Sequence, residues 1–424
     1  MKKTKYLILG AGVSGLSFAS GLGKDEDYII LEKEKQPGGY CKTTRRNGYV
    51  WDYAGHFFHF SHPELKHKFE EITKSDDTVT RVKNTKIYYK DRFIDYPFQK
   101  NIHQLNKDEL IECLYDLFTK VDKENYDNFL DMLYGKFGKG ITNKFLKPYN
   151  EKLYACDLNQ LDVDAMGRFF PYANLEDIIR NMKETNNSSY NNTFIYPKVG
   201  ASIIVEKLLS GIDEQKINYS EKVDEIDFDK RIAITNKGLY QYEYLISSIP
   251  FNELIHISNY QLDQKDHLLS YNQVLVLNLG FDKDSIDKTI HWYYIPDKSV
   301  NFYRVGFYNN IIGDDKLSLY IEIGYPQDFV VDEEEIQKQL NLTLENLRKI
   351  GIIDQHKLLD WQPILMNPAY VHITKDSITI VEKAKQYLES KGVFIVGRYG
   401  EWKYCSIEDC MVDSMKILNK ITNK

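Results

Sequence analysis

Four histidines lie close together, in and just after the segment V-W-D-Y-A-G-H-F-F-H-F at residues 50–60. They are His56, His59, His62 and His67. Imidazole nitrogens can ligate a metal, exchange protons, or satisfy hydrogen bonds in a packed core. The intervening Phe57 and Phe58 supply no ligands, and no carboxylate-plus-histidine signature accompanies them. We therefore expect no metal here, keep His56 as a candidate for chemistry, and assign no role to the other three.

A second candidate is the segment G-A-G-V-S-G at residues 10–15, which could hold the phosphates of a dinucleotide. Gly10 permits a tight turn, Gly12 lets a pyrophosphate approach the backbone, and Gly15 lets a helix pack on a strand. The amides at the start of that helix, at Val13 and Ser14, would face the phosphates. The alternative is an ordinary glycine turn. The predicted strands and helix on either side distinguish a phosphate-binding loop from such a turn.

Those elements have the order that a dinucleotide-binding fold requires. The apolar run at 6–9 predicts a strand, and L-S-F-A-S-G-L at 16–22 predicts a helix. A second strand at 28–31 ends on Glu32, whose carboxylate can accept hydrogen bonds from an adenosine ribose. We expect Lys33, the next residue, to lie beside the cofactor as well.

The chain after Glu32 carries a second glycine pair, in E-K-Q-P-G-G-Y-C-K-T-T-R-R-N-G-Y-V-W-D-Y-A-G-H-F-F. This stretch resembles the extended FAD signature of the amine oxidase and protoporphyrinogen oxidase superfamily. The resemblance implies that FAD, rather than NAD, is the cofactor. It places these further residues beside the cofactor: Gly39, Tyr40, Gly55, His56 and Phe57.

The far end of the chain is expected to return to the same cofactor. G-V-F-I-V-G at 392–397 is typical of a buried strand, and S-x-x-D at 406–409 predicts a cap for a final helix. In the superfamily that this chain resembles, the positive N-terminal end of this helix points at the flavin ring. The implied cofactor contacts here are Gly397, Arg398, Glu408 and Asp409.

The middle of the chain predicts two insertions into the cofactor domain. Residues 106–186 have amphipathic helical spacing, whereas 271–325 alternate as strands do. Short strands at 216–250 predict a return to the cofactor domain, with Val223 beside the adenine. We therefore expect an α/β fold with a discontinuous Rossmann-like FAD-binding domain, an inserted helical domain, and an inserted, mainly antiparallel β-sheet domain. The expected segments are 1–92, 191–252 and 376–424 for FAD binding, 93–190 for the helices, and 253–375 for the substrate-binding sheet.

The composition is ordinary for a globular protein of 424 residues, with 42% hydrophobic and 28% charged residues. A net charge of -7 argues against a nucleic-acid partner. Five scattered cysteines without a C-x-x-C pair indicate reduced thiols and a cytoplasmic location. No apolar stretch approaches the roughly 20 residues of a membrane span. The 32 tyrosines suit a site that stacks a base or sugar and binds phosphate, although composition bias would also explain them.

Four segments spread along the chain resemble UDP-galactopyranose mutases, flavoenzymes that interconvert the pyranose and furanose forms of a nucleotide sugar. They are F-I-D-Y-P-F-Q-K-N-I at 93–102, P-Y-N-E-K-L-Y-A at 148–155, H-W-Y-Y-I-P-D-K-S-V-N-F-Y-R at 291–304 and G-R-Y-G-E-W-K-Y at 397–404. The second more often has tryptophan where Tyr154 stands. Ala54 also departs from relatives that have a second glycine before Gly55.

This resemblance implies roles for specific residues. Arg304 and Arg168 match two arginines that bind the substrate diphosphate, and a guanidinium suits that task because its planar fork keeps its charge. Tyr294, Tyr370 and Tyr404 match tyrosines that hydrogen-bond the same phosphates, and Tyr154 lies in the segment near the nucleotide. With His56 at the flavin edge, the implied catalytic set is His56, Arg304 and Arg168.

The function implied is an isomerase reaction in which reduced FAD attacks the anomeric carbon of UDP-galactose, as in the biosynthesis of cell-surface polysaccharides. The partners implied are a UDP-hexose and an NAD(P)H or other flavin reductant. A homodimer, another sugar and another nucleotide stay open. The alternative is an FAD-dependent oxidase or desaturase of the same superfamily, which would have no need of Arg304. A binding protein that keeps FAD only for stability is a further alternative.

Overall fold

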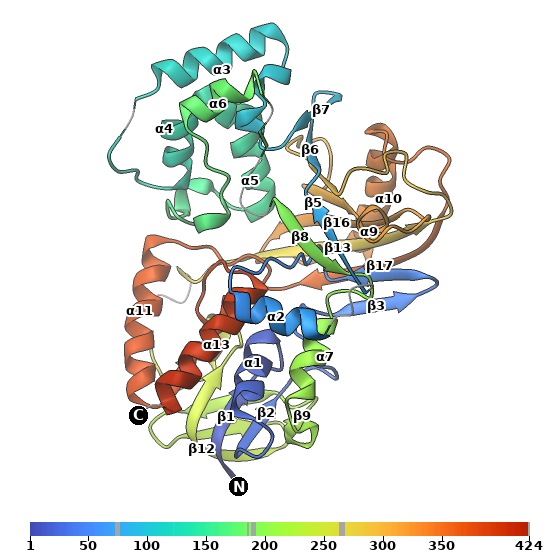
Figure 1. Ribbon diagram of the computed structural model, residues 1–424. Coiled ribbons are helices and arrows are strands. Elements are labelled where there is room, and N and C mark those ends of the chain that lie inside the picture. Colours follow the sequence, from blue (N-terminus) through green and yellow to red (C-terminus); the bar gives the residue numbers. More distant parts are fainter. Residues whose placement is uncertain (73–76, 122, 185, 188–191, 263–267, 423–424) are drawn as a thin grey trace.

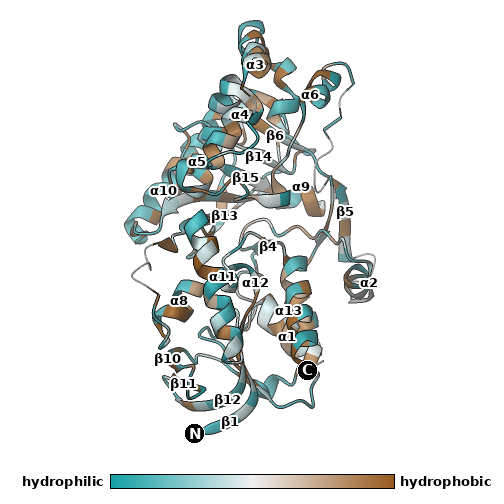
Figure 2. Ribbon diagram, turned by 90° about the vertical axis from the view of Figure 1, so that its left-hand side faces the viewer, coloured by the Kyte–Doolittle hydropathy of each residue, from teal (hydrophilic) through white to brown (hydrophobic). Residues whose placement is uncertain are grey.

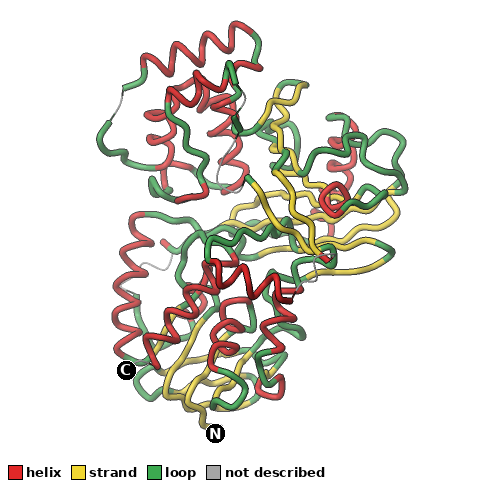
Figure 3. Tube along the Cα trace, viewed as in Figure 1, coloured by secondary structure: helices red, strands yellow, loops and turns green. Residues whose placement is uncertain are grey.

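The computed structural model describes residues 1–424 except 73–76, 122, 185, 188–191, 263–267 and 423–424 (Figure 1). This part of the chain contains two seven-stranded sheets. Figure 3 shows the strands in yellow and, above them, a separate group of helices in red. The expected α/β fold with a Rossmann-like domain and an additional sheet domain is confirmed.

The first sheet is built around β1 (Lys2–Leu9), which pairs in parallel with β2 (Tyr28–Leu31) on one side and β12 (Gly238–Ser247) on the other. Its strand order is β10-β11-β12-β1-β2-β9, with β18 also paired to β12. The remaining bounds are β9 (Ile217–Asn218), β10 (Val223–Asp227), β11 (Ile232–Thr235) and β18 (Val393–Ile395). The strands predicted at 6–9 and 28–31 are thus present, next to strands from distant parts of the chain.

Helices cover both faces of this sheet because successive β1 side chains point to opposite sides. Ile8 packs in one cluster with residues of α1, α7 and α13, whereas Leu7 and Leu9 pack in another with residues of α8 and α11. The bounds of these helices are α1 (Val13–Leu22), α7 (Ile203–Ser210), α8 (Phe251–His256), α11 (Lys375–Ser390) and α13 (Ile407–Thr422). Figure 2 shows hydrophobic and hydrophilic residues mixed along these helices, as amphipathic packing requires.

The second sheet has the order β17-β13-β16-β15-β14-β6-β7. The strand β13, second from one edge, is buried along its whole length: Leu275 and Leu277 pack with α10, and Val274 and Val276 pack with the hairpin β3–β4 and with β8. The bounds are β6 (Thr85–Tyr89), β7 (Arg92–Asp95), β13 (Asn272–Phe281), β14 (Trp292–Tyr294), β15 (Arg304–Phe307), β16 (Ser318–Pro326), β17 (Leu358–Met366), α9 (Tyr308–Ile312) and α10 (Glu333–Lys349). All these strand pairs are antiparallel except β14–β6.

Two short sheets and a helix connect these parts. They are β3 (Thr43–Arg46) with β4 (Tyr49–Asp52), β5 (Thr78–Val82) with β8 (Thr193–Pro197), and α2 (Pro63–Ile72). The tight turn α12 (Gly397–Gly400) follows β18.

The helical group contains α3 (Lys107–Thr119), α4 (Phe129–Ile141), α5 (Lys147–Tyr154) and α6 (Leu175–Asn181), with a π-helical turn at Thr142–Leu146. Asn106 caps α3 by accepting a hydrogen bond from the Glu109 amide at 2.9 Å, as its spacing predicts. Short 3-10 turns occur at Phe98–Lys100, Ile102–Gln104, Leu158–Gln160, Gly167–Phe169 and Glu214–Lys216.

The second sheet starts earlier in the chain than the expected boundary at residue 92, because β6 and β7 pair with β14 and with each other. Residues 85–95 therefore lie in this sheet and not in the first. The other expected boundaries stay a proposal. Among the described residues, no helix combines the length and apolar character needed to cross a membrane.

Candidate cofactor and substrate site

A cavity of about 870 Å³ lies where the first sheet, the second sheet and the helical group meet. The glycine loop after β1 forms one part of its wall. Tyr294 and Arg304 from the second sheet form another part, and Tyr149 and Phe169 from the helical group a third. All three parts of the fold therefore contribute to one site.

Most of the residues singled out in the sequence line this cavity. They are Gly10, Gly12, Val13, Ser14, Glu32, Lys33, Gly39, Tyr40, Gly55, His56, Phe57, Val223, Tyr294, Arg304, Tyr370, Arg398 and Tyr404. Six others lie outside the cavity wall: Gly15, Tyr154, Arg168, Gly397, Glu408 and Asp409. The roles of all of these residues stay proposals, and the structure adds what each one contacts.

The two glycine segments lie side by side. The amide of Gly38 donates to the carbonyl of Ala11 at 2.7 Å, and Gly12 and Gly38 form an isolated parallel bridge. Gly39 allows this arrangement because a Cβ there would already lie 3.4 Å from the Gly12 Cα. Gly15 lets α1 pack against its own loop and on β1, because a Cβ there would lie 2.1 Å from the Gly10 carbonyl oxygen. The backbone can therefore approach a phosphate along both segments.

Glu32 anchors the first loop. Its carboxylate accepts hydrogen bonds from the Ala11 amide at 2.7 Å and from the Glu34 amide at 2.9 Å. A carboxylate has about four lone-pair positions, so two bonds leave capacity for ribose hydroxyls. Gly397 brings the C-terminal segment close to the same loop, because a Cβ there would lie 2.0 Å from Ser14 Oγ.

Arg398 supplies the positive charge at this end of the cavity. Its guanidinium lies 4.4 Å above the ring of Tyr404 and 5.1 Å above that of Tyr370. Its buried Nε and Nη2 have no hydrogen-bond partner among the described residues. Unpaired buried donors beside a helix N-terminus fit an anionic diphosphate. The glycine segments, Glu32 and Arg398 thus fit FAD, and the expected cofactor is supported by the fold and by this wall.

His56 lies in the cavity wall between the two sheets. Burial lowers the pKa of His56 to about 4, opposed by a backbone contact with Ala54 and assisted by the charges of Arg398 and Arg304. The imidazole is therefore neutral at neutral pH. Its Nδ1 has no hydrogen-bond partner in the described part of the chain. A neutral imidazole in the wall can form a hydrogen bond with a ligand and leave the charge of the site unchanged.

Arg304 begins β15 and points into the cavity opposite Glu322 of β16, its register partner. Arg304 Nη2 donates to both Glu322 carboxylate oxygens, at 2.7 and 2.6 Å. The Glu322 side chain is 1% exposed and that of Arg304 is 21% exposed. Burial opposes the Arg304 charge, but Glu322 overrides it and holds the pKa of Arg304 above its usual range. Arg304 is therefore a fixed cation.

Tyrosines surround the two arginines. Tyr96 stacks on Tyr294 at 4.6 Å, Tyr149 meets the same ring edge-on at 5.3 Å, and Tyr370 stacks on Tyr404 at 5.8 Å. Burial raises the pKa of Tyr370 to about 12, so its hydroxyl stays protonated. A wall of phenol hydroxyls and guanidinium groups suits a phosphate-bearing ligand.

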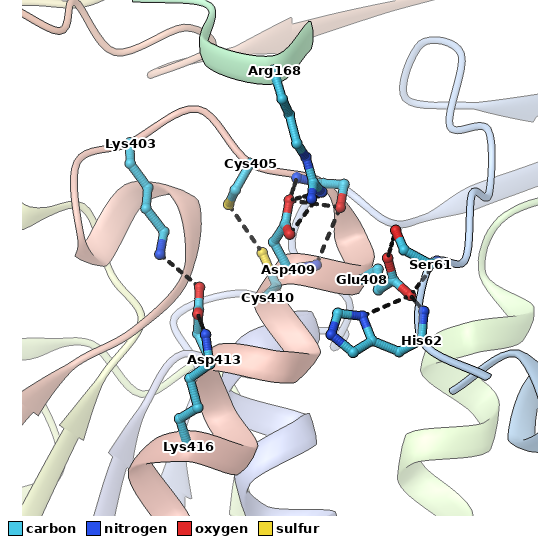
Figure 4. Close-up of polar contacts among 11 residues, drawn as sticks. Ser61, His62, Arg168, Lys403, Cys405, Glu408, Asp409, Cys410, Asp413 and Lys416 are labelled. Carbon is cyan, nitrogen blue, oxygen red and sulfur yellow. Dashed lines mark hydrogen bonds and ion pairs between the residues drawn. The ribbon is translucent and has the colours of Figure 1, made fainter. Parts of the chain in front are cut away.

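Arg168 does not line the cavity and is paired with a carboxylate beside it. Its Nη2 donates to both oxygens of Asp409, at 2.8 Å each, and so connects the helical group to the start of α13 (Figure 4). Asp409 in turn caps that helix by accepting from the Ser406 amide at 2.8 Å, while the Asp409 amide donates to Ser406 Oγ. The predicted cap is confirmed.

Glu408 is turned to the other side of the same helix. It is buried and accepts hydrogen bonds from the amides of Ser61 and His62, both at 2.8 Å, as Figure 4 shows. Glu408 therefore holds the backbone at Ser61 and His62 in place beside α13. Tyr154 is likewise buried behind the wall, with its ring edge-on to Tyr370 at 6.1 Å, and so positions that ring.

Several residues at the site carry no role in the sequence analysis. Glu322 is one, although a single carboxylate in the apolar run L-Y-I-E-I-G-Y is a usable signal for a buried partner. His59 lines the cavity, with Nδ1 2.9 Å from the Thr193 carbonyl. Cys405 and Cys410 also line it. Within the described ranges, no cluster of three or more His, Cys, Asp or Glu residues could hold a metal.

Comparison with known proteins agrees with this geometry. The model of the NAD(P)-binding Rossmann-like domain matches residues 8–72. A crystal structure of reduced UDP-galactopyranose mutase superposes with a TM-score of 0.90, covering 99% of this chain and 96% of that one at 22% identity. The chain has the fold of UDP-galactopyranose mutase. That fold includes both sheets and the helical group, and so accounts for all three walls of the cavity.

Oxidases and a desaturase are also similar to this chain, with a lower TM-score than the mutase or over a smaller share of the sequence. A protein from Exiguobacterium sp. 255-15 assigned as a protoporphyrinogen oxidase has a TM-score of 0.76 at 15% identity, over 99% of this chain and 98% of that one. Coproporphyrinogen III oxidase of Staphylococcus aureus is 23% identical over 56% of both chains. Zeta-carotene-forming phytoene desaturase of Myxococcus xanthus is 27% identical over 34% of this chain and 29% of that protein. The chain thus spans about half, or less, of the curated relatives that it matches.

Proposed function

We propose that this protein is a flavin-dependent mutase that interconverts the pyranose and furanose forms of a nucleotide sugar, with UDP-galactose as the substrate. The observation that carries this proposal is the position of Arg304. The glycine segments and Arg398 can serve the diphosphate of the cofactor, whereas Arg304 adds a second arginine in the same cavity, from the other sheet. A nucleotide sugar brings a second diphosphate that needs such a cation.

The reduced flavin would supply the nucleophile for the anomeric carbon, and the residues of this chain would position and stabilise the reactants. Arg304 and the hydroxyls of Tyr294, Tyr370 and Tyr404 would hold the diphosphate as it leaves the sugar, so that it stays in place for reattachment. His56, being neutral, would donate or accept a hydrogen bond without changing the charge of the site. Val223 would lie beside the adenine of the cofactor.

The desaturase interpretation accounts for the cofactor end of the cavity but not for Arg304, the second arginine of its wall. Carotenoids need a largely apolar wall, and a buried arginine held by Glu322 beside tyrosine hydroxyls would be a costly feature there. A porphyrinogen carries propionate carboxylates that could pair with this arginine, so the substrate test decides between that oxidase and the mutase. The proposal includes a cytoplasmic location, NAD(P)H or another reductant for the flavin, and a homodimer.

The test is an anaerobic incubation of the purified protein with UDP-galactofuranose, with and without dithionite, followed by chromatography for UDP-galactopyranose. We expect conversion only in the reduced sample. Normal flavin reduction without conversion of UDP-galactofuranose would remove galactose as the substrate. Loss of conversion in Arg304→Ala, with unchanged flavin content, would link the reaction to this arginine.

A further inference from the structure

Two cysteines face each other in the wall of the cofactor cavity. Cys405 precedes the cap of α13 and Cys410 lies in its first turns, and their Sγ atoms are 3.7 Å apart (Figure 4). Both residues line the cavity. A disulfide needs an Sγ–Sγ distance of about 2.0 Å, so the sulfurs must approach by only about 1.7 Å. Rotation of one or both side chains can supply much of that approach.

The surroundings activate one of these two thiols. The thiol–thiol contact lowers the pKa of Cys410 and raises that of Cys405. The amide of Cys410 donates to the Ser406 carbonyl at 3.1 Å, which places this thiol near the positive end of a 16-residue helix. Arg398 also favours the Cys410 thiolate. Cys410 is therefore the nucleophile of the pair, and Cys405 its resolving partner.

The location of the pair connects it to the cofactor end of the cavity. A Cβ at Gly397 would lie 3.8 Å from the Cys410 sulfur and 2.0 Å from Ser14 Oγ. Ser414 Oγ, one turn after Cys410, donates to the Ser14 carbonyl at 2.8 Å. The thiols thus lie beside the loop that would carry the cofactor phosphates and the ribityl chain.

We propose that Cys405 and Cys410 form a redox-active dithiol that closes to a disulfide and delivers two electrons to the FAD in this cavity. Both S–H bonds break and one S–S bond forms. The two electrons and one proton reduce oxidised FAD to its anionic reduced form, and the second proton leaves to solvent. An external dithiol then reduces the disulfide by thiol–disulfide exchange through Cys410, and is itself oxidised to a disulfide.

This inference rests on FAD occupying the cavity, but not on the sugar reaction. It gives the proposed mutase a route to the reduced flavin that it needs, without a nicotinamide site. A structural role for two packed thiols would explain their burial but would not require them to lie in the cavity wall.

Electron counting on the oxidised, FAD-loaded protein tests the proposal directly. We expect an anaerobic dithionite titration to consume four electrons per wild-type chain, two for FAD and two for the disulfide. The single variants Cys405→Ser and Cys410→Ser should consume two, and Cys156→Ser, which changes a thiol outside the cavity wall, should still consume four. Uptake of two electrons by the wild type would overturn the proposal.

Two further measurements test which cysteines form the disulfide and whether the dithiol passes its electrons to FAD. Peptide mapping of the oxidised wild type should show a Cys405–Cys410 disulfide, and a disulfide to Cys41 instead would overturn the assignment. Dithiothreitol should bleach the flavin of the wild type and of Cys156→Ser faster than the flavin of Cys405→Ser or Cys410→Ser. Equal rates would overturn the electron delivery. Failure of the mutase assay in a protein that passes these tests would remove the proposed function and leave this inference standing.

Discussion

Arg304 and Glu322 face each other across adjacent strands of the second sheet, and the carboxylate of Glu322 is almost completely buried beneath the guanidinium. Only one guanidinium nitrogen, Nη2, is used in this pair. Arg304 Nε has no hydrogen-bond partner in the described part of the chain. The pair therefore fixes the arginine in place and leaves donors for a ligand.

Replacing Arg304 by Ala should weaken the binding of UDP. The loss of hydrogen bonds from a charged donor costs roughly 1.5–3 kcal/mol, which corresponds to about a tenfold to hundredfold higher Kd. Isothermal titration calorimetry on the FAD-loaded protein would measure this. Arg46→Ala is the matched control, because Arg46 also pairs with a carboxylate, that of Asp360, but lines no part of the cavity. Equal Kd values for the two variants would remove Arg304 from the binding site.

Arg168→Ala and Asp409→Asn should have little effect on the free energy of unfolding. They should differ in their effect on the affinity for UDP. Their ion pair is partly exposed, with 44% and 23% of the side chains accessible, so its loss should cost at most about 1 kcal/mol. If Arg168 binds the substrate diphosphate, it must first leave Asp409. We expect Asp409→Asn to bind UDP at least as tightly as the wild type and Arg168→Ala to bind it more weakly. Unchanged affinity in both would confine Arg168 to a structural role.

His56→Ala should alter the flavin absorption spectrum and lower activity, because a neutral imidazole next to the ring would be lost. The variant His67→Ala changes an exposed residue of α2 and serves as the control. The pKa of His56, lowered to about 4 by burial, also predicts that its titration does not shape the activity profile between roughly pH 5 and 8. An activity change near pH 6.5 that disappears in His56→Ala would contradict this.

Asp52 should make the protein more stable in mild acid than at neutral pH. Burial raises the pKa of Asp52 from 3.8 to about 6, against hydrogen bonds from Thr43, Tyr196 and the Ala201 amide. A folded-state pKa above the unfolded value gives stability that is complete below about pH 4 and is lost as the pH rises through 6.

The variant Asp52→Asn cannot lose this contribution. The free energy of unfolding of the variant relative to the wild type should therefore rise by on the order of 2–3 kcal/mol between pH 4 and pH 7. Urea unfolding at both pH values would measure it, and other titrating groups cancel in the comparison. A difference independent of pH would show that Asp52 keeps an ordinary pKa.

The parts of this site that depend on local sequence could be predicted. Gly10, Gly12 and Gly15 act within one loop, and the caps of Asn106 and Ser406 act within one helical turn. The contacts that join distant parts could not. Nothing near Arg168 in the sequence indicates that it reaches Asp409, 241 residues further on. The contact between Cys405 and Cys410 could not be predicted either. Their sulfurs meet only because the cap at Ser406 and the first turns of α13 lie between the two residues.

The first sheet also constrains when the cofactor can enter. Its strand β1 pairs with β12, and β12 pairs with β18, which starts at Val393 of a 424-residue chain. Arg398 and the start of α13 follow immediately. During synthesis, the cavity is incomplete until β18 and α13 have left the ribosome, so stable uptake of FAD should follow the completion of the first sheet.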